Sequence, residues 1–332
     1  MNLQERSELL IRLGEYMQGT EESWQAAKYR AHGENNWFIP EFIELSVKNI
    51  VTNFLQPEAV KKFAAQYAIP EENTAPKKVG VVLAGNIPLV GFHDVMCIFL
   101  SGHYAIIKPS SKDSILIKHL LERLIEWKPE AAPYFVLQDL LKSCDAYIAT
   151  GSNNTARYFE HYFQKYPHII RRNRTSVAIL DGSETAEELE SLSDDICQFF
   201  GLGCRNVTKL FVPKGHDFVP LIGALNKYDY LINHNKYKNN YDHNLAMHIL
   251  NNQYYMTNGS VLLIENTSPF SPISQVHYEF YTAIQSVEQG LADNADIQCI
   301  VGHQHLAFGQ AQCPAVDTFA DNVDTLKFLL SL

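Results

Sequence analysis

The stretch that decides the fold is VGVVLAGNIP, at residues 79–88. Its first six residues are almost all apolar and rich in valine, which is typical of a buried strand. The Gly-Asn-Ile-Pro that follows ends the strand in a turn, because glycine bends freely and proline cannot continue the strand ladder. We therefore expect a buried strand that carries Asn86 just beyond its carboxyl end.

Further apolar runs follow at residues 104–108, 146–150 and 176–180. Segments with helical periodicity lie between the first of them, at about 92–100 and 114–125. Strands that alternate with helices at this spacing predict a mostly parallel, doubly wound α/β sheet.

Small or polar residues end three of these strands: Gly85-Asn86, Lys108-Pro109-Ser110 and Gly151-Ser152. Ligands of such sheets bind beyond the carboxyl ends of the strands, so this half of the chain is a candidate nucleotide-binding domain. No GxGxxG follows a strand, so the ordinary dinucleotide fingerprint is absent.

A second candidate site is the stretch FFGLGCRNVTKLFV at residues 199–212. Cys204 follows two glycines and precedes an apolar run that starts another strand, and the glycines would let a substrate approach the thiol. The structural alternative is a packing cysteine, since free cysteines are among the most buried residues.

The rest of the chain predicts helices before residue 79, a second α/β region and a closing helix. We expect residues 1–180 to form the N-terminal helices and the cofactor domain, and residues 181–310 to form a catalytic domain with Cys204. Residues 311–332 are expected to pack back on the core. In the second region strands are predicted at 210–213, 260–264, 276–280 and 298–302.

Composition excludes several classes of protein. The 332 residues carry a net charge of -10, whereas a nucleic-acid-binding protein is usually basic. No apolar run is long enough to span a bilayer, and the six cysteines show neither CxxC pairs nor zinc spacing. We expect a cytoplasmic protein with free thiols, no metal site, no nucleic-acid partner and no membrane span.

Taken in order, these motifs resemble the aldehyde dehydrogenase superfamily, and most of all its LuxC-like bacterial acyl-CoA reductases, which supply aldehyde for bioluminescence. The resemblance runs from about residue 79 to residue 272. It includes the nucleophile segment around Cys204, with Lys209 five residues later, and the asparagine-before-proline turn at Asn86. The lysine turn at Lys108 and the glycine-serine turn at Gly151 also match.

The resemblance implies an aldehyde-dehydrogenase-like fold and NAD(P)H-dependent reduction of an acyl-CoA to the aldehyde. Cys204 would attack the thioester carbonyl and carry the acyl group, and Asn86 would donate to the oxyanion together with the Cys204 N–H. The cofactor would be bound by six residues on two turns: Lys108, Pro109, Ser110, Ser111, Gly151 and Ser152.

Departures from the family pattern refine this expectation. Arg171 stands where aldehyde-oxidising members carry the glutamate that activates water, which favours a CoA-linked reductase over a hydrolytic enzyme. Ser111 replaces an acidic residue that binds the ribose hydroxyls, which favours NADPH, with NADH as the alternative. Ser268 stands where many members have the glutamate that contacts the nicotinamide ribose.

Three basic residues, Arg171, Arg172 and Arg174, form either a solvated face or a dock for CoA phosphates. The expected partner is an acyl-CoA or another acyl thioester, and a homo-oligomer is compatible with the sequence. Two alternatives stay open. One is another reaction of the superfamily, either acyl phosphate reduction or aldehyde oxidation, and the other is a catalytically degenerate nucleotide-binding subunit.

Overall fold

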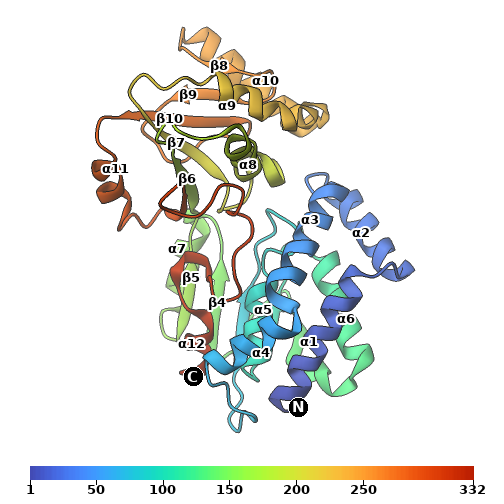
Figure 1. The fold of residues 1–332 in the computed structure, drawn as a ribbon. Helices are drawn as coiled ribbons and strands as arrows, with labels where there is room; N and C mark the ends of the chain where they lie inside the picture. Colours follow the sequence, from blue (N-terminus) through green and yellow to red (C-terminus); the bar gives the residue numbers. More distant parts are fainter. The chain divides into compact units, whose positions relative to one another are not determined.

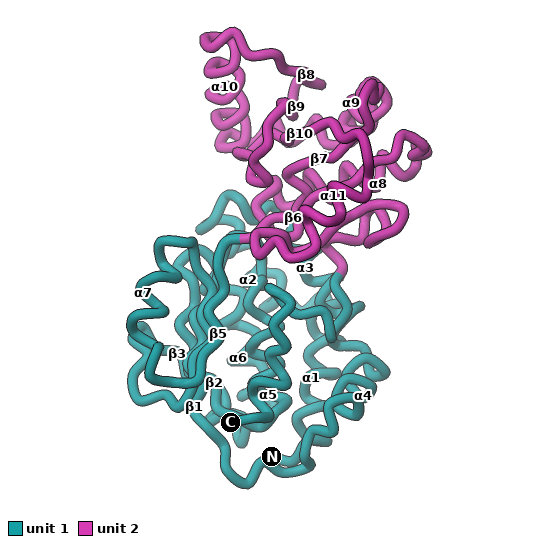
Figure 2. The backbone as a smooth tube through the Cα atoms, turned by 90° about the vertical axis from the view of Figure 1, so that its left-hand side faces the viewer, with its two compact units in different colours: residues 1–173, 314–332 teal, residues 174–313 magenta.

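The structure is a computed structural model that describes residues 1–332. The chain forms two compact units, residues 1–173 with 314–332 and residues 174–313 (Figure 2). Each unit is built on one β-sheet, and Figure 1 labels the elements. None of the helices combines the length and the hydropathy that crossing a bilayer requires.

The sheet of the first unit has five parallel strands in the order β3-β2-β1-β4-β5. The strand order reverses between β1 and β4, which makes this point the topological switch of the sheet. The strands are β1 (Lys78–Val82), β2 (Tyr104–Lys108), β3 (Phe135–Leu137), β4 (Ala146–Thr150) and β5 (His168–Arg171).

The two faces of this sheet are covered unequally. Val79 and Val81 of β1 belong to a large apolar core that also contains residues of α1, α3, α4, α5, α6 and α12. Tyr147 of β4 faces the other side, where its ring stacks on Phe163 of α7 at 4.0 Å. The helices are α1 (Leu3–Gln18), α2 (Glu22–Glu34), α3 (Pro40–Ile50), α4 (Pro57–Gln66), α5 (Phe92–Leu100), α6 (Ile115–Trp127), α7 (Asn153–Phe163) and α12 (Thr325–Leu330); short helical turns are η1 (Val51–Leu55), η2 (Pro129–Tyr134) and η5 (Ala320–Asn322).

The second unit contains a six-stranded sheet in the order β11-β6-β7-β10-β9-β8. All neighbours are parallel except β8 and β9. The strands are β6 (Thr175–Ile179), β7 (Val207–Pro213), β8 (Met256–Thr257), β9 (Leu262–Glu265), β10 (Gln275–Tyr281) and β11 (Ile297–Val301); the helices are α8 (Ala186–Cys197), α9 (Val219–Ala224), α10 (Asn235–Leu250) and α11 (Ile284–Leu291), with helical turns η3 (Gln198–Gly201) and η4 (Leu225–Asn233).

The strand predicted at 176–180 lies in this second sheet, between β11 and β7, and not beside the first three predicted strands. The fifth strand of the first sheet is β5, whose run of two isoleucines is too short to be recognised from periodicity. The units therefore divide between Asn173 and Arg174, seven residues before the expected boundary at residue 180. Residues 314–332 belong to the first unit, where α12 packs against α5.

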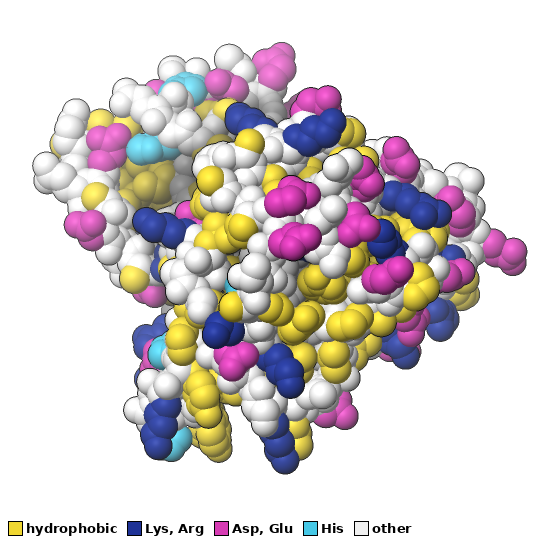
Figure 3. Space-filling view, turned by 90° about the horizontal axis from the view of Figure 1, so that it is seen from below, with side chains coloured by type: hydrophobic (Ala, Val, Ile, Leu, Met, Phe, Trp, Pro, Cys, Tyr) yellow, Lys and Arg dark blue, Asp and Glu magenta, His cyan; other side chains and the backbone are white.

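Charged side chains of both signs are interspersed on the face drawn in Figure 3, among hydrophobic side chains. This face therefore carries no large patch of a single sign. Mixed charges of this kind produce little long-range electrostatic steering.

Candidate active site

Three turns lie side by side at the carboxyl edge of the first sheet, since β1 pairs with β2 on one side and with β4 on the other. They carry Asn86, the Lys108–Ser111 segment and Gly151-Ser152. The structure thus brings these predicted site residues of the first unit to the switch point of the sheet, where ligands of doubly wound sheets bind.

The Asn86 turn is held from two directions. Asp113 accepts the backbone N–H of Leu89 at 2.6 Å, and the Ser46 hydroxyl donates to the carbonyl of Pro88 at 2.5 Å. Leu89 has a left-handed backbone (φ 57°), which is unfavourable for a leucine and requires such support. Asn86 itself is exposed at the tip of the turn.

Asp113 is unusual among the carboxylates of the chain. It is 6% exposed, and its second oxygen, Oδ1, has no hydrogen-bond partner. Burial raises its pKa to about 7, and the Leu89 N–H opposes this only in part. Sequence analysis did not single out this residue, because an aspartate in a polar turn is usually solvent-exposed.

The Lys108 turn packs closely on the Asn86 turn. A Cβ placed on Gly85 would lie 2.4 Å from Ser110 Oγ, so a side chain at position 85 would force the two turns apart. Lys108 and Ser111 are exposed, and the Ser110 hydroxyl accepts the N–H of Lys112 at 3.2 Å. Both exposed side chains are accessible to a ligand at this edge.

Gly151-Ser152 joins β4 to α7. The Ser152 hydroxyl caps α7 by accepting the N–H of Thr155 at 3.4 Å, and Gly151 donates its N–H to the Arg171 carbonyl at 3.2 Å. Ser152 is therefore the N-cap of α7. A helix N-terminus of this kind also favours a nearby anion, so the cap is compatible with a phosphate contact.

Cys204 lies in the second unit, in a tight turn immediately before β7. The turn spans Gly203–Asn206 and is closed by a bond from Asn206 N–H to Gly203 O at 3.1 Å. The Ser176 hydroxyl of β6 donates to the Cys204 carbonyl at 3.1 Å. Cys204 is half-buried, whereas Cys97, Cys144 and Cys197 are buried.

The segment that leads to this turn has an uncommon backbone. Phe199 (φ 54°, ψ 28°) and Phe200 (φ 57°, ψ 23°) are both left-handed, and Gly201 follows with φ 71°. A left-handed conformation costs an L-residue other than glycine about 1–2 kcal/mol. Both phenylalanines are buried, and Phe200 packs against His234 and Tyr237 with ring centroids 4.7 and 5.7 Å away.

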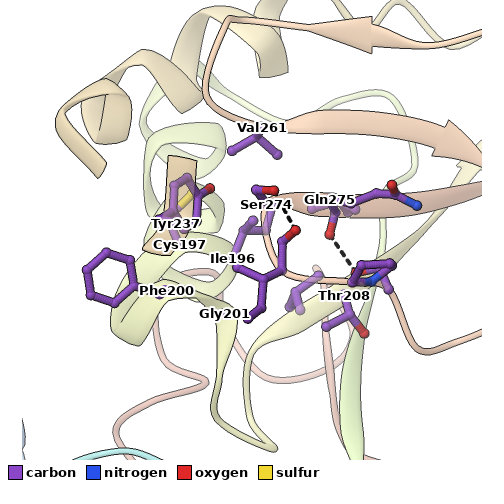
Figure 4. A pocket seen from close by; sticks show the side chains of 14 residues that line it. Ile196, Cys197, Phe200, Gly201, Thr208, Tyr237, Val261, Ser274 and Gln275 are labelled. Atoms are coloured by element: carbon purple, nitrogen blue, oxygen red, sulfur yellow. Dashed lines mark hydrogen bonds between the residues drawn. The ribbon is translucent and has the colours of Figure 1, made fainter. Parts of the chain in front are cut away.

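Figure 4 shows a cavity behind this segment, with Phe200, Tyr237 and Val261 among the side chains that line it. Its volume is about 20 Å³. A single water needs roughly 10–15 Å³ on this measure, so the cavity holds about one water and no acyl chain.

Lys209, the basic residue five positions after Cys204, is 1% exposed. Its ammonium group donates to the Thr267 carbonyl at 2.7 Å and pairs with Glu279 at 2.5 Å. The carbonyl bond fixes the loop after β9, and Lys209 is therefore a structural cation at this position.

The proposed dock for CoA phosphates needs a correction at Arg171. This side chain is 4% exposed, forms an ion pair with Asp94 and donates to the Thr325 hydroxyl at 2.7 Å. A guanidinium that is buried and paired in this way cannot receive a solvent-borne phosphate, so Arg171 joins β5 to α5 and α12 instead. Arg172 pairs with Glu160 on the surface, and Arg174 donates to the Ile297 carbonyl at 3.2 Å.

The sequence of the chain is similar to one known protein family. The profile of the family described as acyl-CoA reductase (LuxC) matches residues 22–232. No curated protein sequence matches the chain.

Solved structures of aldehyde dehydrogenases share the fold. Aldehyde dehydrogenase 21 from Physcomitrella patens, in complex with the reaction product succinate, aligns with a TM-score of 0.72 at 13% identity, over 100% of this chain and 84% of that one. The Mycobacterium tuberculosis enzyme complexed with NAD+ aligns with a TM-score of 0.65 at 14% identity, over 89% of this chain and 72% of that one. The NAD+ complex from Bacillus cereus has a TM-score of 0.64 at 14% identity, over 89% and 70% of the two chains.

Proposed function

The chain belongs to the LuxC acyl-CoA reductase family, and from this premise we propose that it reduces an acyl-CoA thioester to the aldehyde through an acyl group carried on Cys204. The observation that supports this most directly is the position of Cys204 in a tight turn before β7, with its carbonyl fixed by Ser176. A thiolate nucleophile divides a difficult acyl transfer into two easier steps.

In the first step the Cys204 sulfur attacks the carbonyl carbon of the acyl-CoA. A new carbon–sulfur bond forms, the bond to CoA breaks, and the CoA sulfur leaves with the proton that Cys204 has given up. Asn86 and the Cys204 N–H donate to the oxyanion that develops on the carbonyl oxygen.

In the second step the acyl group on Cys204 is reduced to a hemithioacetal and takes one proton from solvent at its oxygen. The nicotinamide cofactor, when bound, supplies the hydride for this reduction. Collapse of the hemithioacetal breaks the bond to Cys204 and releases the aldehyde, and the hydroxyl proton returns to the sulfur, which restores the thiol.

The cofactor would lie at the carboxyl edge of the first sheet. The fit rests on the switch point between β1 and β4, the exposed Lys108, and the N-terminus of α7 behind Ser152. We propose NADPH in preference to NADH, because Ser111 adds no negative charge and Lys112 on the same turn is exposed. Arg172 and Arg174 remain the proposed contacts for the phosphates of CoA.

Hydrolysis of the acyl enzyme is disfavoured in this proposal. The position of the water-activating glutamate is occupied by Arg171, whose guanidinium is already paired with Asp94. With no base there, water competes poorly with reduction or with return of the acyl group to CoA. Acyl phosphate reduction, aldehyde oxidation and a degenerate nucleotide-binding role remain the alternatives.

The test is mass spectrometry of the intact protein after incubation with an acyl-CoA and no reductant, followed by peptide mapping. We expect one acyl adduct, on Cys204, which disappears when NADPH is added and aldehyde is formed. The Cys204→Ala variant should give no adduct, and Cys313→Ala, the matched control at another half-buried thiol, should give the wild-type adduct. An adduct on a different cysteine, or none on the folded protein, contradicts the proposal.

A further inference from the structure

We infer that Asn206 is a positioning residue whose buried side-chain amide holds the Cys204 turn in its reactive geometry. The inference rests on the proposed function for the role of Cys204 as nucleophile. It concerns a residue two positions beyond the cysteine that contacts no reacting atom.

The amide of Asn206 satisfies groups on both sides of the strained segment. Its Nδ2 group faces three carbonyls at the end of α8 and in η3, and its Oδ1 accepts the N–H of Gly203 at 2.8 Å. The side chain is 0% exposed, so water cannot replace these bonds. The three carbonyls, with their distances from Nδ2, are Asp195 O (3.0 Å), Ile196 O (3.3 Å) and Gln198 O (2.8 Å).

These partners explain why an amide is required. The last carbonyls of an α-helix have no partner within the helix, and a side-chain NH2 can supply two hydrogens to them. The Gly203 N–H needs an acceptor in the same place. Among short side chains only that of asparagine offers two N–H donors and a carbonyl acceptor together without a charge.

The bonds also explain how the left-handed segment persists. Phe199, Phe200 and Gly201 lie between the carbonyls that Asn206 holds on one side and the Gly203 N–H that it holds on the other. Unfavourable backbone conformations persist only where the surroundings determine them, and they are enriched at functional sites. Because Gly203 directly precedes Cys204, loss of the Asn206 bonds moves the thiol first.

Asp195, in the last turn of α8, supports this interpretation through its own hydrogen bonds. Its carboxylate accepts the N–H groups of Gly309 at 2.6 Å and Ala311 at 2.9 Å, while its carbonyl receives Asn206. The last turn of α8 therefore fixes both the Cys204 turn and the segment after β11.

The experiment compares Asn206→Asp and Asn206→Ala with the wild type by the rate at which iodoacetamide alkylates Cys204, followed by peptide mapping across pH. In Asn206→Asp a protonated carboxyl can still donate to one carbonyl, whereas an ionised carboxylate faces three carbonyl oxygens. We expect a rate near that of the wild type at low pH and a falling ratio to the wild type as the pH rises. Asn206→Ala, which adds no charge, should be slower at every pH, including the limiting rate at which the thiol is fully ionised.

A second readout is the rate of Cys204 acylation by an acyl-CoA. A displacement of about 1 Å can cost an enzymatic step about 100-fold, and we expect a loss of this order in Asn206→Ala. The matched control is Ser193→Ala, which removes a buried hydroxyl from the same helix without touching the turn. It should lower the unfolding midpoint and retain the wild-type alkylation and acylation rates.

Alkylation requires no acyl-CoA, so the inference and the proposed function can fail separately. Wild-type alkylation profiles in both folded Asn206 variants would overturn the positioning role. If Asn206→Ala does not fold, the pH profile of Asn206→Asp decides, and a ratio to the wild type that is constant with pH counts against the inference.

Discussion

The carboxylate of Asp113 accepts the backbone N–H of Leu89 at 2.6 Å and thereby joins the turn after β2 to the turn that carries Asn86. Its pKa is raised to about 7 by burial, so the bond is made by a carboxyl group that titrates near neutral pH. Two turns of the proposed site are thus joined by one buried hydrogen bond, and its acceptor is a group that can gain or lose a proton.

The first prediction concerns stability and pH. The folded protein retains a proton on Asp113 up to a pKa of about 7, whereas the unfolded chain releases it near the ordinary aspartate pKa of 3.8. The stabilising contribution of the protonated group is therefore complete below 3.8 and is lost as the pH rises through 7. Asp113→Asn keeps an acceptor for Leu89 and cannot ionise, so the variant does not lose this contribution as the pH rises. The unfolding free energy of the variant minus that of the wild type should therefore increase by about 2–4 kcal/mol from acid to alkaline pH.

Denaturant titrations across this pH range test the prediction. Asp195 also has a pKa raised to about 7 by burial, but it contributes equally to wild type and variant, so the difference between them isolates Asp113. A difference that does not change with pH would show that Asp113 is ionised in the folded protein throughout.

The second prediction concerns the contact between the Asn86 and Lys108 turns. Gly85→Ala places a methyl group about 2.4 Å from Ser110 Oγ, so the turns must separate and NADPH should bind more weakly. Gly33→Ala is the control, because Gly33 lies in α2 and a Cβ there would meet nothing within 4 Å. Calorimetric titration should show an increased Kd for the first variant only; equal Kd values would mean that the contact does not shape the cofactor site.

The third prediction concerns cofactor choice. Ser111→Asp restores a carboxylate to the turn, and two charges about 4 Å apart interact with about 1–4 kcal/mol between water and a protein surface. The ratio of kcat/KM for NADPH to that for NADH should therefore fall by about 10-fold or more. Ser111→Asn adds similar bulk without charge and should leave the ratio nearly unchanged. If both variants behave alike, charge at this position does not select the cofactor.

The fourth prediction concerns Arg171 in its corrected role. Removing one partner of a buried ion pair typically costs about 3–5 kcal/mol, so Arg171→Met should strongly lower the unfolding midpoint. The KM for acyl-CoA should stay near the wild-type value in the protein that remains folded. Arg172→Met, at the exposed pair with Glu160, should show the opposite pattern, with little loss of stability and a raised KM. A raised KM in Arg171→Met alone would restore Arg171 as a phosphate contact.

Much of the fold could be predicted from local pattern. The apolar runs at residues 79–84, 104–108 and 146–150 correspond to β1, β2 and β4, because buried parallel strands are nearly continuous in apolar residues. β5 was missed because its apolar run is very short. The helix α2 lies within the region before residue 79 that was predicted to be helical. The run at 176–180 was predicted correctly as a strand and assigned to the wrong sheet, since periodicity does not report pairing partners.

The sequence by itself determined the order of strands and turns, the position of Cys204 after its glycines, and the family resemblance, because these depend on neighbours along the chain. Only the tertiary structure decided what Arg171, Asp113 and Asn206 do. Each is a polar residue that sequence alone would place at the surface, and each is buried against groups supplied by distant segments or by the backbone. Burial removes competing water, so the partners of these three residues set their charge and their hydrogen bonds, and those partners are fixed by how the chain packs.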